Sequence, residues 1–253
     1  FLYPGHTVKR MHGTPNRTGA ELMGSLCNAA ERAGVDILTD ATVTSLVADP
    51  DGRVHGLRCT RPDGSTEDLA CRALILACCG FAGNQAMVRQ FIPEIEKGEF
   101  FGHPGNQGDA VIWGQALGGT VADMSGYQGH AGLAKGYGIP ILWPTIVEGG
   151  IQVNQSGRRF SNEARGYSEQ AVDVLKQSGA IAWTFFDESR HALMQEFDDY
   201  RDAIKAGAIQ RGETLAEICQ KTHLPLDTMR DTLANISDLA ESDELDNFGR
   251  SFR

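Results

Sequence analysis

The sequence of 253 residues lacks several features that would assign it at once to a class of protein. No apolar run approaches the roughly 18 residues that a membrane-spanning helix requires, so we expect no membrane span. Basic residues are scarce: 23 lysines and arginines stand against 33 aspartates and glutamates, which gives a net charge of −10. A chain this acidic is not expected to bind nucleic acid or an anionic membrane, and an anionic ligand would need a local basic site.

Cysteine is present, but its spacing shows no ligand set or disulfide framework. The six cysteines form no CxxC pair and have no histidine at metal-ligand spacing, so we predict no metal site. Cys71, Cys78 and Cys79 lie in or beside apolar sequence, where a thiol behaves as a small hydrophobic group. This usage indicates a reducing, cytoplasmic compartment and no structural disulfides.

A GxGxxG motif after a strand is also missing, so the sequence alone places no site for a dinucleotide pyrophosphate. What the chain contains instead is a mixture of helical and strand patterns. Apolar residues recur at helical spacing over 18–33, and Gly34 follows as a stop signal. Short strands separated by PDG turns are then predicted over 35–40, 41–49, 53–60 and 65–73. A helix followed by an antiparallel meander is the expected result.

The next segment has a different pattern. Residues 74–79 are continuously apolar, which is typical of a strand buried on both faces. Asn84 is expected to cap a helix that stops at Pro93, and a glycine-flanked loop enters another helix at Asp109. The turn after residue 79 either brings the backbone close to a ligand or is a plain strand-to-helix connection.

The second half is richer in charged helices. Residues 123–138 contain too many glycines for regular structure, and residues 140–154 are expected to be extended. A strand is predicted over 180–189, and four helices follow near 189–197, 199–206, 213–221 and 226–236. The change in composition near residues 120–130 indicates a domain boundary.

Residues 151–170, IQVNQSGRRFSNEARGYSEQ, concentrate the chemistry-bearing side chains. We predict a strand, a turn at Gly157, and a helix that Ser168 caps. This arrangement holds Arg158, Arg159, a glutamate and Tyr167 close together, as a site for an anionic or carbonyl substrate would. The alternative is a hairpin with a solvated charge pair, and we favour this surface reading for the two arginines.

His130 is a second candidate because it lies between glycines that leave its ring unobstructed. A neutral imidazole at this position could donate a hydrogen bond to a substrate carboxylate or carbonyl. The alternative is a loop histidine without a role. The other histidines have no metal-ligand spacing.

Several stretches taken in order resemble the FAD-dependent fumarate reductase/succinate dehydrogenase flavoprotein family and the related 3-ketosteroid dehydrogenases. The matching stretches are RTGAELMGSL (17–26), AGVDILTDATVTSLVADPDGRVHGL (33–57), ALILACCGFAGN (73–84), GNQGDAVIWGQALGG (105–119), DMSGYQGH (123–130), GGIQVNQSGRRFSNE (149–163), FDESRHALMQEF (186–197) and DNFGR (246–250). The resemblance implies an α/β and α+β architecture that is a piece of a longer flavoprotein lacking both ends. Residues 1–124 would be the central part of a Rossmann-like FAD-binding domain with the antiparallel meander, and residues 125–253 an α+β capping domain that covers substrate.

The resemblance also implies roles for individual residues. The residues expected to contact FAD are Val43, Ala77, Cys78, Gly80 and Asp109. His130 matches the family's substrate-binding histidine. Cys79 replaces a glycine usual in the family, which makes close backbone approach to FAD less certain.

The proton pathway of the fumarate reductases has no match in this chain. Tyr167 occupies the position of their proton-donating arginine, and Trp143 and Ile146 occupy those of the relaying glutamate and arginine. A tyrosine here is similar to the acid or base of the ketosteroid dehydrogenases. Its ordinary pKa, near 10, requires help to act near neutrality, and Arg165 could supply a positive charge.

We therefore expect a parent protein that reduces or desaturates a C–C bond next to the carbonyl or carboxylate of a small-molecule substrate, with FAD supplying the electron chemistry. The alternatives are a ketosteroid-dehydrogenase-like enzyme that uses Tyr167 as acid or base, and a catalytically inert fragment without bound FAD. The sequence identifies no electron partner.

Overall fold

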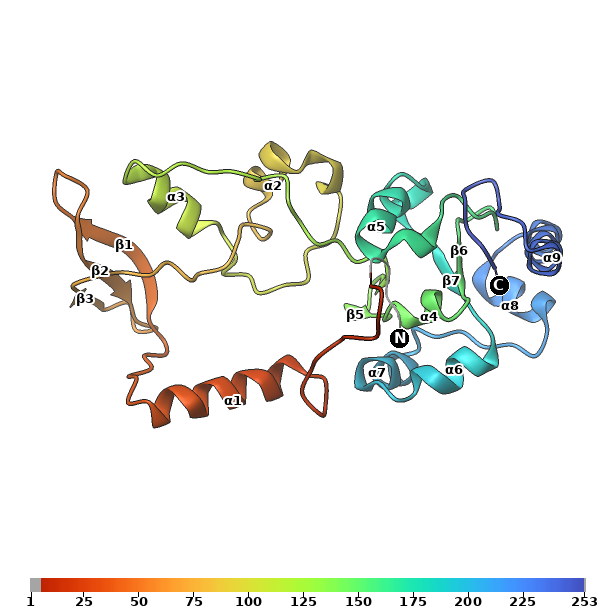
Figure 1. The fold of residues 1–253 in the computed structure, drawn as a ribbon, viewed down its shortest axis with the longest axis horizontal. Coiled ribbons are helices and arrows are strands. Elements are labelled where there is room, and N and C mark those ends of the chain that lie inside the picture. The colour runs from red at the N-terminus through yellow and green to blue at the C-terminus, as the bar shows by residue number, and fades with distance from the viewer. Residues whose placement is uncertain (1–5, 253) are drawn as a thin grey trace. The chain divides into compact units, whose positions relative to one another are not determined.

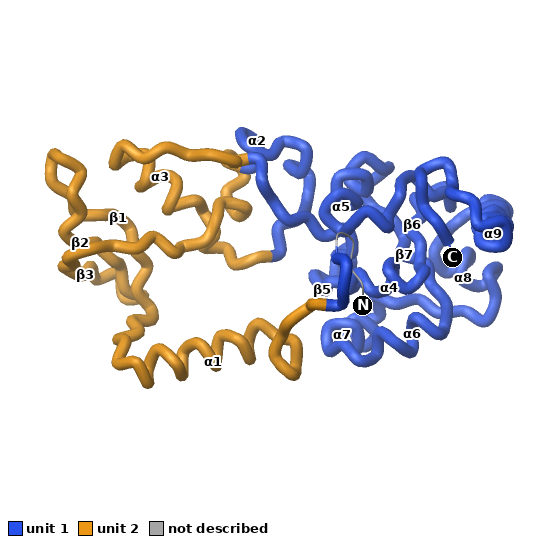
Figure 2. The backbone as a smooth tube through the Cα atoms, viewed as in Figure 1, with its two compact units in different colours: residues 1–9, 88–101, 125–253 blue, residues 10–87, 102–124 orange. Residues whose placement is uncertain are grey.

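The computed structural model of the protein describes residues 6–252 and combines helices with small antiparallel sheets (Figure 1). The chain forms two compact units, of which unit 1 contains residues 1–9, 88–101 and 125–253 and unit 2 contains residues 10–87 and 102–124 (Figure 2). Over the described range, no helix combines the length and the apolar character needed to cross a bilayer. The assignment of residues 1–124 and 125–253 to two functional domains stays a prediction.

Unit 2 begins with α1 (Gly19–Arg32), as the helical spacing predicts. Thr18 is its N-cap, because the side-chain hydroxyl accepts a hydrogen bond from the Glu21 N–H at 3.2 Å. No residue of α1 is buried, and the large side chains Leu22, Met23 and Leu26 are about half exposed or more.

The antiparallel meander predicted after this helix is confirmed. Its strands are β1 (Thr42–Ala48), β2 (Val54–Thr60) and β3 (Thr66–Ala70), paired in the order β1-β2-β3. Leu57 on the central strand lies opposite Leu46 on one side and Leu69 on the other, so three leucines form a cross-strand row. Gly56 is required at its position, because a Cβ there would lie 2.4 Å from the Leu69 carbonyl oxygen.

Two strands predicted for unit 2 are wrong. Residues 35–40 and 74–79 have extended or irregular backbone without ladder pairing. Several of their apolar side chains are also exposed: Ile75 is 87% accessible and Val35 54%. A strand requires a neighbouring strand for its N–H and C=O groups, whereas apolar sequence supplies only the tendency to be buried.

The helices that flank the second of these segments agree with the sequence. Asn84 caps α2 (Gln85–Phe91), since its Oδ1 accepts the Met87 N–H at 3.2 Å. A 3-10 turn, η1 (Pro93–Ile95), follows where the proline stops the helix. The predicted start at Asp109 is also confirmed, because α3 spans Asp109–Ala116.

Unit 1 contains two short antiparallel ladders. The first pairs β4 (Leu133–Ala134), inside the glycine-rich segment predicted as loop, with β5 (Ile139–Pro140), which directly follows that segment. The second pairs β6 (Ile151–Val153) with β7 (Trp183–Phe185). The expectation that residues 140–154 are extended throughout is wrong, because Pro144 begins the helix α4 (Pro144–Val147) inside this stretch.

The remaining elements of unit 1 are mostly helical. They are η2 (Glu163–Arg165), α5 (Tyr167–Leu175), η3 (Ser178–Ala180), α6 (Glu188–Met194), α7 (Asp198–Ala206), α8 (Leu215–Thr222) and α9 (Leu226–Ser242). The predicted cap at Ser168 is wrong. Gly166 precedes the first helical residue of α5, and the Ser168 hydroxyl donates to the Gly129 carbonyl at 3.2 Å instead.

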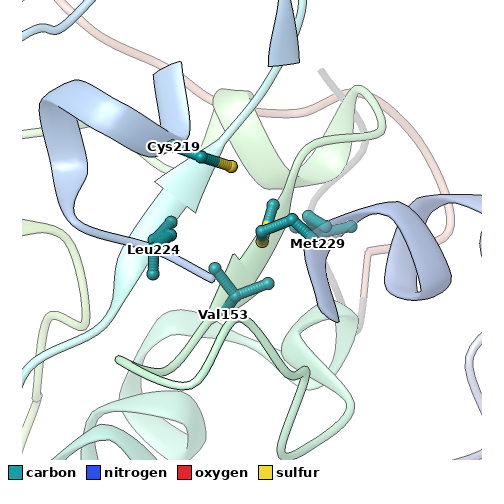
Figure 3. Packing of buried hydrophobic residues seen from close by; sticks show 5 residues of the cluster. Val153, Cys219, Leu224 and Met229 are labelled. Carbon is teal, nitrogen blue, oxygen red and sulfur yellow. The ribbon is translucent and has the colours of Figure 1, made fainter. Parts of the chain in front are cut away.

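The apolar core of unit 1 lies between β6 and the last two helices (Figure 3). Val153 and Met229 are fully buried and pack with Ile151, Cys219 and Leu224. Gly157 turns the chain beside this core with a φ of +73°, and a Cβ there would lie 3.1 Å from Met229 Cγ. The core therefore fixes β6 and the turn that follows it, from which the candidate site extends.

Candidate functional site

In unit 2, hydrogen bonds join the turn after residue 79 to the loop before α3. The Gly108 N–H donates to the Gly80 carbonyl at 3.0 Å, and the Gly83 N–H donates to the Asn106 carbonyl at 2.8 Å. Asn84 adds a side-chain bond, from Nδ2 to the Gln107 carbonyl at 3.0 Å. Gly108 has a φ of +86° and no room for a Cβ, which would lie 2.5 Å from Met87 Sδ. The two loops thus form one rigid backbone surface.

This surface contains a polar atom without a partner. Asn106 donates from Nδ2 to Cys79 Sγ at 3.6 Å, while its Oδ1 is buried and accepts no hydrogen bond from residues 6–252. An unpaired buried acceptor costs about 1–3 kcal/mol, so a ligand N–H or O–H bound here would recover that energy. The adjacent backbone at Gly80 is exposed. The loop pair therefore fits a ligand that donates a hydrogen bond and approaches backbone closely.

The other predicted cofactor residues also belong to unit 2. Ala77 is exposed and Cys78 half-buried in the segment before the turn. Asp109 is the first residue of α3, where the positive end of the helix dipole stabilises its carboxylate. Val43 is half-buried on β1 opposite Cys59. Their role in holding a cofactor stays a prediction.

Cys79 has a φ of +66°, a left-handed conformation that costs a residue with a Cβ about 1–2 kcal/mol. We expect Cys79→Gly to raise the free energy of unfolding of unit 2 by about 0.5–1 kcal/mol. The strain that glycine removes exceeds the sum of two losses: the greater entropy of the unfolded chain and the long bond from Asn106 Nδ2 to Cys79 Sγ. Urea unfolding followed by Trp113 fluorescence measures the change. Cys78→Gly is the matched control, and it should destabilise, since Cys78 has no positive φ. Equal effects of the two variants would contradict the prediction.

In unit 1, the predicted site residues His130 and Tyr167 belong to a cluster of four aromatic rings. The His130 imidazole stacks on the Tyr167 ring, with centroids 5.4 Å apart and planes at 29°. Trp143 meets both rings edge-on, at 6.5 Å from His130 and 6.2 Å from Tyr167. Phe101 meets His130 edge-on at 6.5 Å. The structure thus brings together His130 and Tyr167, which are 37 positions apart in the chain.

The polar atoms of the stacked pair have defined partners. The Tyr167 hydroxyl oxygen accepts a hydrogen bond from Gln128 Nε2 at 2.7 Å. His130 Nδ1 accepts the Gly132 N–H at 3.2 Å, so in the neutral ring the proton is on Nε2. Burial lowers the pKa of His130 below its ordinary value, against a smaller opposing effect of its own backbone. The pair therefore presents a phenol and a neutral imidazole N–H donor.

The lowered pKa of His130 predicts a pH dependence. The unfolded chain binds a proton at this imidazole at a higher pH than the folded chain does. The stability of unit 1 should therefore fall as the pH is lowered through about 6.5, the ordinary value of a histidine. NMR titration of the ring, assigned with a His130→Gln variant, measures the folded pKa. A value at or above 6.5 would contradict the prediction.

Arg165 lies two positions before Tyr167, but its guanidinium bonds elsewhere. Arg165 Nη2 is 3.2 Å from Asp173 Oδ2, and the arginine side chain is 57% exposed. Asp173 neutralises part of the Arg165 charge, so Arg165 supplies less positive charge near Tyr167 than the sequence predicts. The described contacts of the phenol oxygen are made by Gln128, which the sequence did not single out.

The surface reading of the arginine pair is right for Arg158 and wrong for Arg159. Arg158 is exposed, whereas the Arg159 side chain is only 7% accessible. Arg159 Nη2 donates to Glu163 Oε2 at 2.6 Å, and Nη1 donates to Asp246 Oδ2. Arg250 completes the group, with Nη1 2.9 Å from Glu163 Oε1. Two cations and two anions thus form a buried ion network that holds no substrate-facing charge.

Two further residues of the site escaped sequence reasoning. Asn106 belongs to the matched GNQGDA stretch, whose aspartate alone was singled out. Trp143 was noted only as a departure from a proton relay, yet it is 2% exposed and contacts both rings of the stacked pair. The sequence around Trp143 contains no pattern that would predict its contacts with His130 and Tyr167. Among residues 6–252, no group of three or more His, Cys, Asp or Glu side chains could hold a metal ion.

The profile of a family described as FAD binding domain matches residues 3–242. The chain belongs to this FAD-binding domain family. It is 24% identical over 242 residues to a probable fumarate reductase from Shewanella frigidimarina, covering 96% of this chain and 40% of that protein. It is 27% identical over 266 residues to 3-oxosteroid 1-dehydrogenase from Mycolicibacterium smegmatis, covering 92% of this chain and 44% of that protein.

A solved structure shares the fold of this chain. The open conformation of a flavocytochrome c3 fumarate reductase matches with a TM-score of 0.76 and 22% sequence identity, over 96% of this chain and 42% of that chain. The chain therefore spans less than half the length of the relatives it matches.

Proposed function

We propose that the protein containing this chain is an FAD-dependent oxidoreductase that reduces or desaturates a C–C bond next to a carbonyl or carboxylate. The observation that carries the proposal is the stacked pair of His130 and Tyr167, in a chain of the FAD-binding domain family. A neutral N–H donor and a phenol side by side are the groups that bind a carbonyl oxygen and exchange a proton with an adjacent carbon. FAD, when bound, supplies the electron chemistry.

In this proposal unit 2 residues hold the cofactor. The residues are Val43, Ala77, Cys78, Gly80, Asp109 and, added by the structure, Asn106. The unpaired Asn106 Oδ1 and the exposed backbone at Gly80 support a bound group with an N–H and a flat face. Residues 1–124 would form the central part of a Rossmann-like FAD-binding domain, and residues 125–253 an α+β capping domain.

Tyr167 exchanges the proton at its hydroxyl oxygen. The Gln128 amide donates to that oxygen at 2.7 Å, which holds the hydroxyl in a defined position. His130 orients the substrate oxygen through Nε2–H, because its Nδ1 is engaged by the Gly132 N–H. Arg165 contributes positive charge to the same segment, reduced by its bond to Asp173.

The ketosteroid-dehydrogenase-like alternative has its own support. Trp143 is 2% exposed and Ile146 1% exposed, so apolar side chains fill the positions where a dicarboxylate reductase would need charged proton relays. The stacked pair lies against the Trp143 ring. An apolar enone therefore suits the site better than a small dicarboxylate does. Fumarate is the less favoured substrate.

Turnover assays on the complete flavoprotein test this function. We expect a steroid-like enone, or its saturated ketone with an electron acceptor, to be converted faster than fumarate or succinate. Preferential turnover of fumarate would contradict the proposal. Equilibrium binding of FAD to the 253-residue chain tests the remaining alternative. Micromolar binding would show that the contacts of unit 2 suffice, and failure to bind would identify an inert fragment.

A further inference from the structure

A chain of buried amides runs beneath the stacked pair. Gln152 on β6 is 2% exposed, and Gln170 on α5 is 1% exposed. Gln152 Nε2 donates to the Ala131 carbonyl at 3.0 Å, one residue after His130. Gln170 Nε2, three residues after Tyr167, donates to Gln152 Oε1 at 3.0 Å. One side-chain amide thus binds both segments that carry the stacked pair.

The nitrogen and oxygen of the Gln152 amide cannot exchange places without loss of its hydrogen bonds with Ala131 and Gln170. Its nitrogen is the donor to Ala131 and to Thr184 Oγ1, which lies at 3.2 Å, and its oxygen is the acceptor from Gln170. The opposite orientation would place an oxygen against the Ala131 carbonyl and an N–H against the Gln170 amide. The partners therefore define a single arrangement of the bridge.

The ion network fixes the backbone of the same residue. Glu163 Oε1 accepts the Gln152 N–H at 3.0 Å, and Arg159 and Arg250 hold that carboxylate. Ser161 supports the other end, because its hydroxyl donates to Gln170 Oε1 at 2.7 Å. The side chains of Gln152, Gln170 and Ser161 are buried and hydrogen-bonded to one another, so displacement of one of them leaves its partners unpaired at substantial cost.

We propose that Gln152 is a positioning residue that sets the placement of His130 on Tyr167. The inference rests on the proposed function for its catalytic meaning, but the geometry it describes is measurable without turnover. Two direct links between the segments also exist: Ala131 N–H to the Tyr167 carbonyl at 3.3 Å, and Ser168 Oγ to the Gly129 carbonyl at 3.2 Å. They are longer than the 3.0 Å bonds that join the Gln152 amide to Ala131 and to Gln170, so they hold the segments less firmly.

The test is NMR of the 253-residue chain with Gln152→Met, a side chain of equal length without polar atoms. We expect the nuclear Overhauser effect between the His130 and Tyr167 rings to be lost and the ring-current shift of the His130 protons to change. Ser161→Ala is the control, since it removes a buried hydrogen bond of the same chain without touching Ala131. It should leave both signals in place.

A folded Gln152→Met variant with unchanged His130 signals would overturn the proposal, because the direct links would then suffice. If this variant does not fold, Gln152→Glu decides by the same readout. A carboxylate can still accept from Gln170 but cannot donate to Ala131, so the His130 signals should change while α5 remains attached. These outcomes do not depend on turnover, so a failure of the proposed function would leave them unaffected.

Discussion

Replacing Glu163 with glutamine should lower the free energy of unfolding of unit 1 by about 3–5 kcal/mol, the cost of breaking a buried ion pair from one side. The Glu163 side chain is 1% exposed and lies between Arg159 and Arg250. Glutamine preserves the shape of the side chain but removes its charge. The N–H groups of its amide would also face the N–H groups of a guanidinium, so that neither could accept a hydrogen bond from the other. Arg159 would then retain its ion pair with Asp246, whereas Arg250 would retain its hydrogen bonds to the Ile146 and Gly150 carbonyls. Urea unfolding followed by the fluorescence of Trp143 and Trp183 measures the loss.

The control for this prediction is an exposed pair of the same unit. Lys221 Nζ lies 2.7 Å from Glu217 Oε1, and both side chains are about 40% exposed. Glu217→Gln should cost much less than Glu163→Gln, because solvent screens a pair of this kind. If Glu163→Gln lowered the free energy of unfolding by no more than Glu217→Gln, the buried network would contribute no more to stability than a surface pair.

Replacing Tyr167 with phenylalanine in the complete flavoprotein should lower kcat by about 10²- to 10⁴-fold, the contribution of one positioned acid or base. The ring would still stack on His130, so the substitution removes only the hydroxyl that Gln128 binds. The KM should change much less than kcat, because the proton is transferred in the transition state and not on binding. Steady-state kinetics with an enone substrate give both constants.

Tyr137→Phe is the matched control for the loss of a hydroxyl. The Tyr137 side chain is 47% exposed, and its hydroxyl donates to the Gly207 carbonyl at 3.4 Å. This variant should keep the parental kcat. If Tyr167→Phe also kept it, the phenol would have no part in proton transfer and the assignment of Tyr167 would be wrong.

Sequence patterns predicted the elements whose causes are local. The meander followed from alternating strands and PDG turns, and the start of α2 followed from the Asn84 cap. Residues 35–40 and 74–79 failed as strands because pairing depends on a neighbour, which composition does not specify. The helix α4 escaped prediction because four residues are too few to show a period.

Some residues of the candidate site could be named from the sequence, but their arrangement could not. Tyr167 and His130 could be named in advance, whereas their stacking depends on a fold that brings distant segments together. The burial of Arg159 was missed for the same reason. Its partner Asp246 lies 87 positions away, in an acidic stretch that by itself is typical of a solvated surface.

The unpaired run at residues 74–79, in which exposed and half-buried residues alternate, affects the behaviour of the chain in solution. Six apolar or small residues without a charge or a proline, with unpaired backbone, form the type of segment through which polypeptides add to one another as β-strands. The net charge of −10 opposes such association at low ionic strength, and added salt screens that repulsion. Concentration and salt therefore act together on the solubility of the isolated chain.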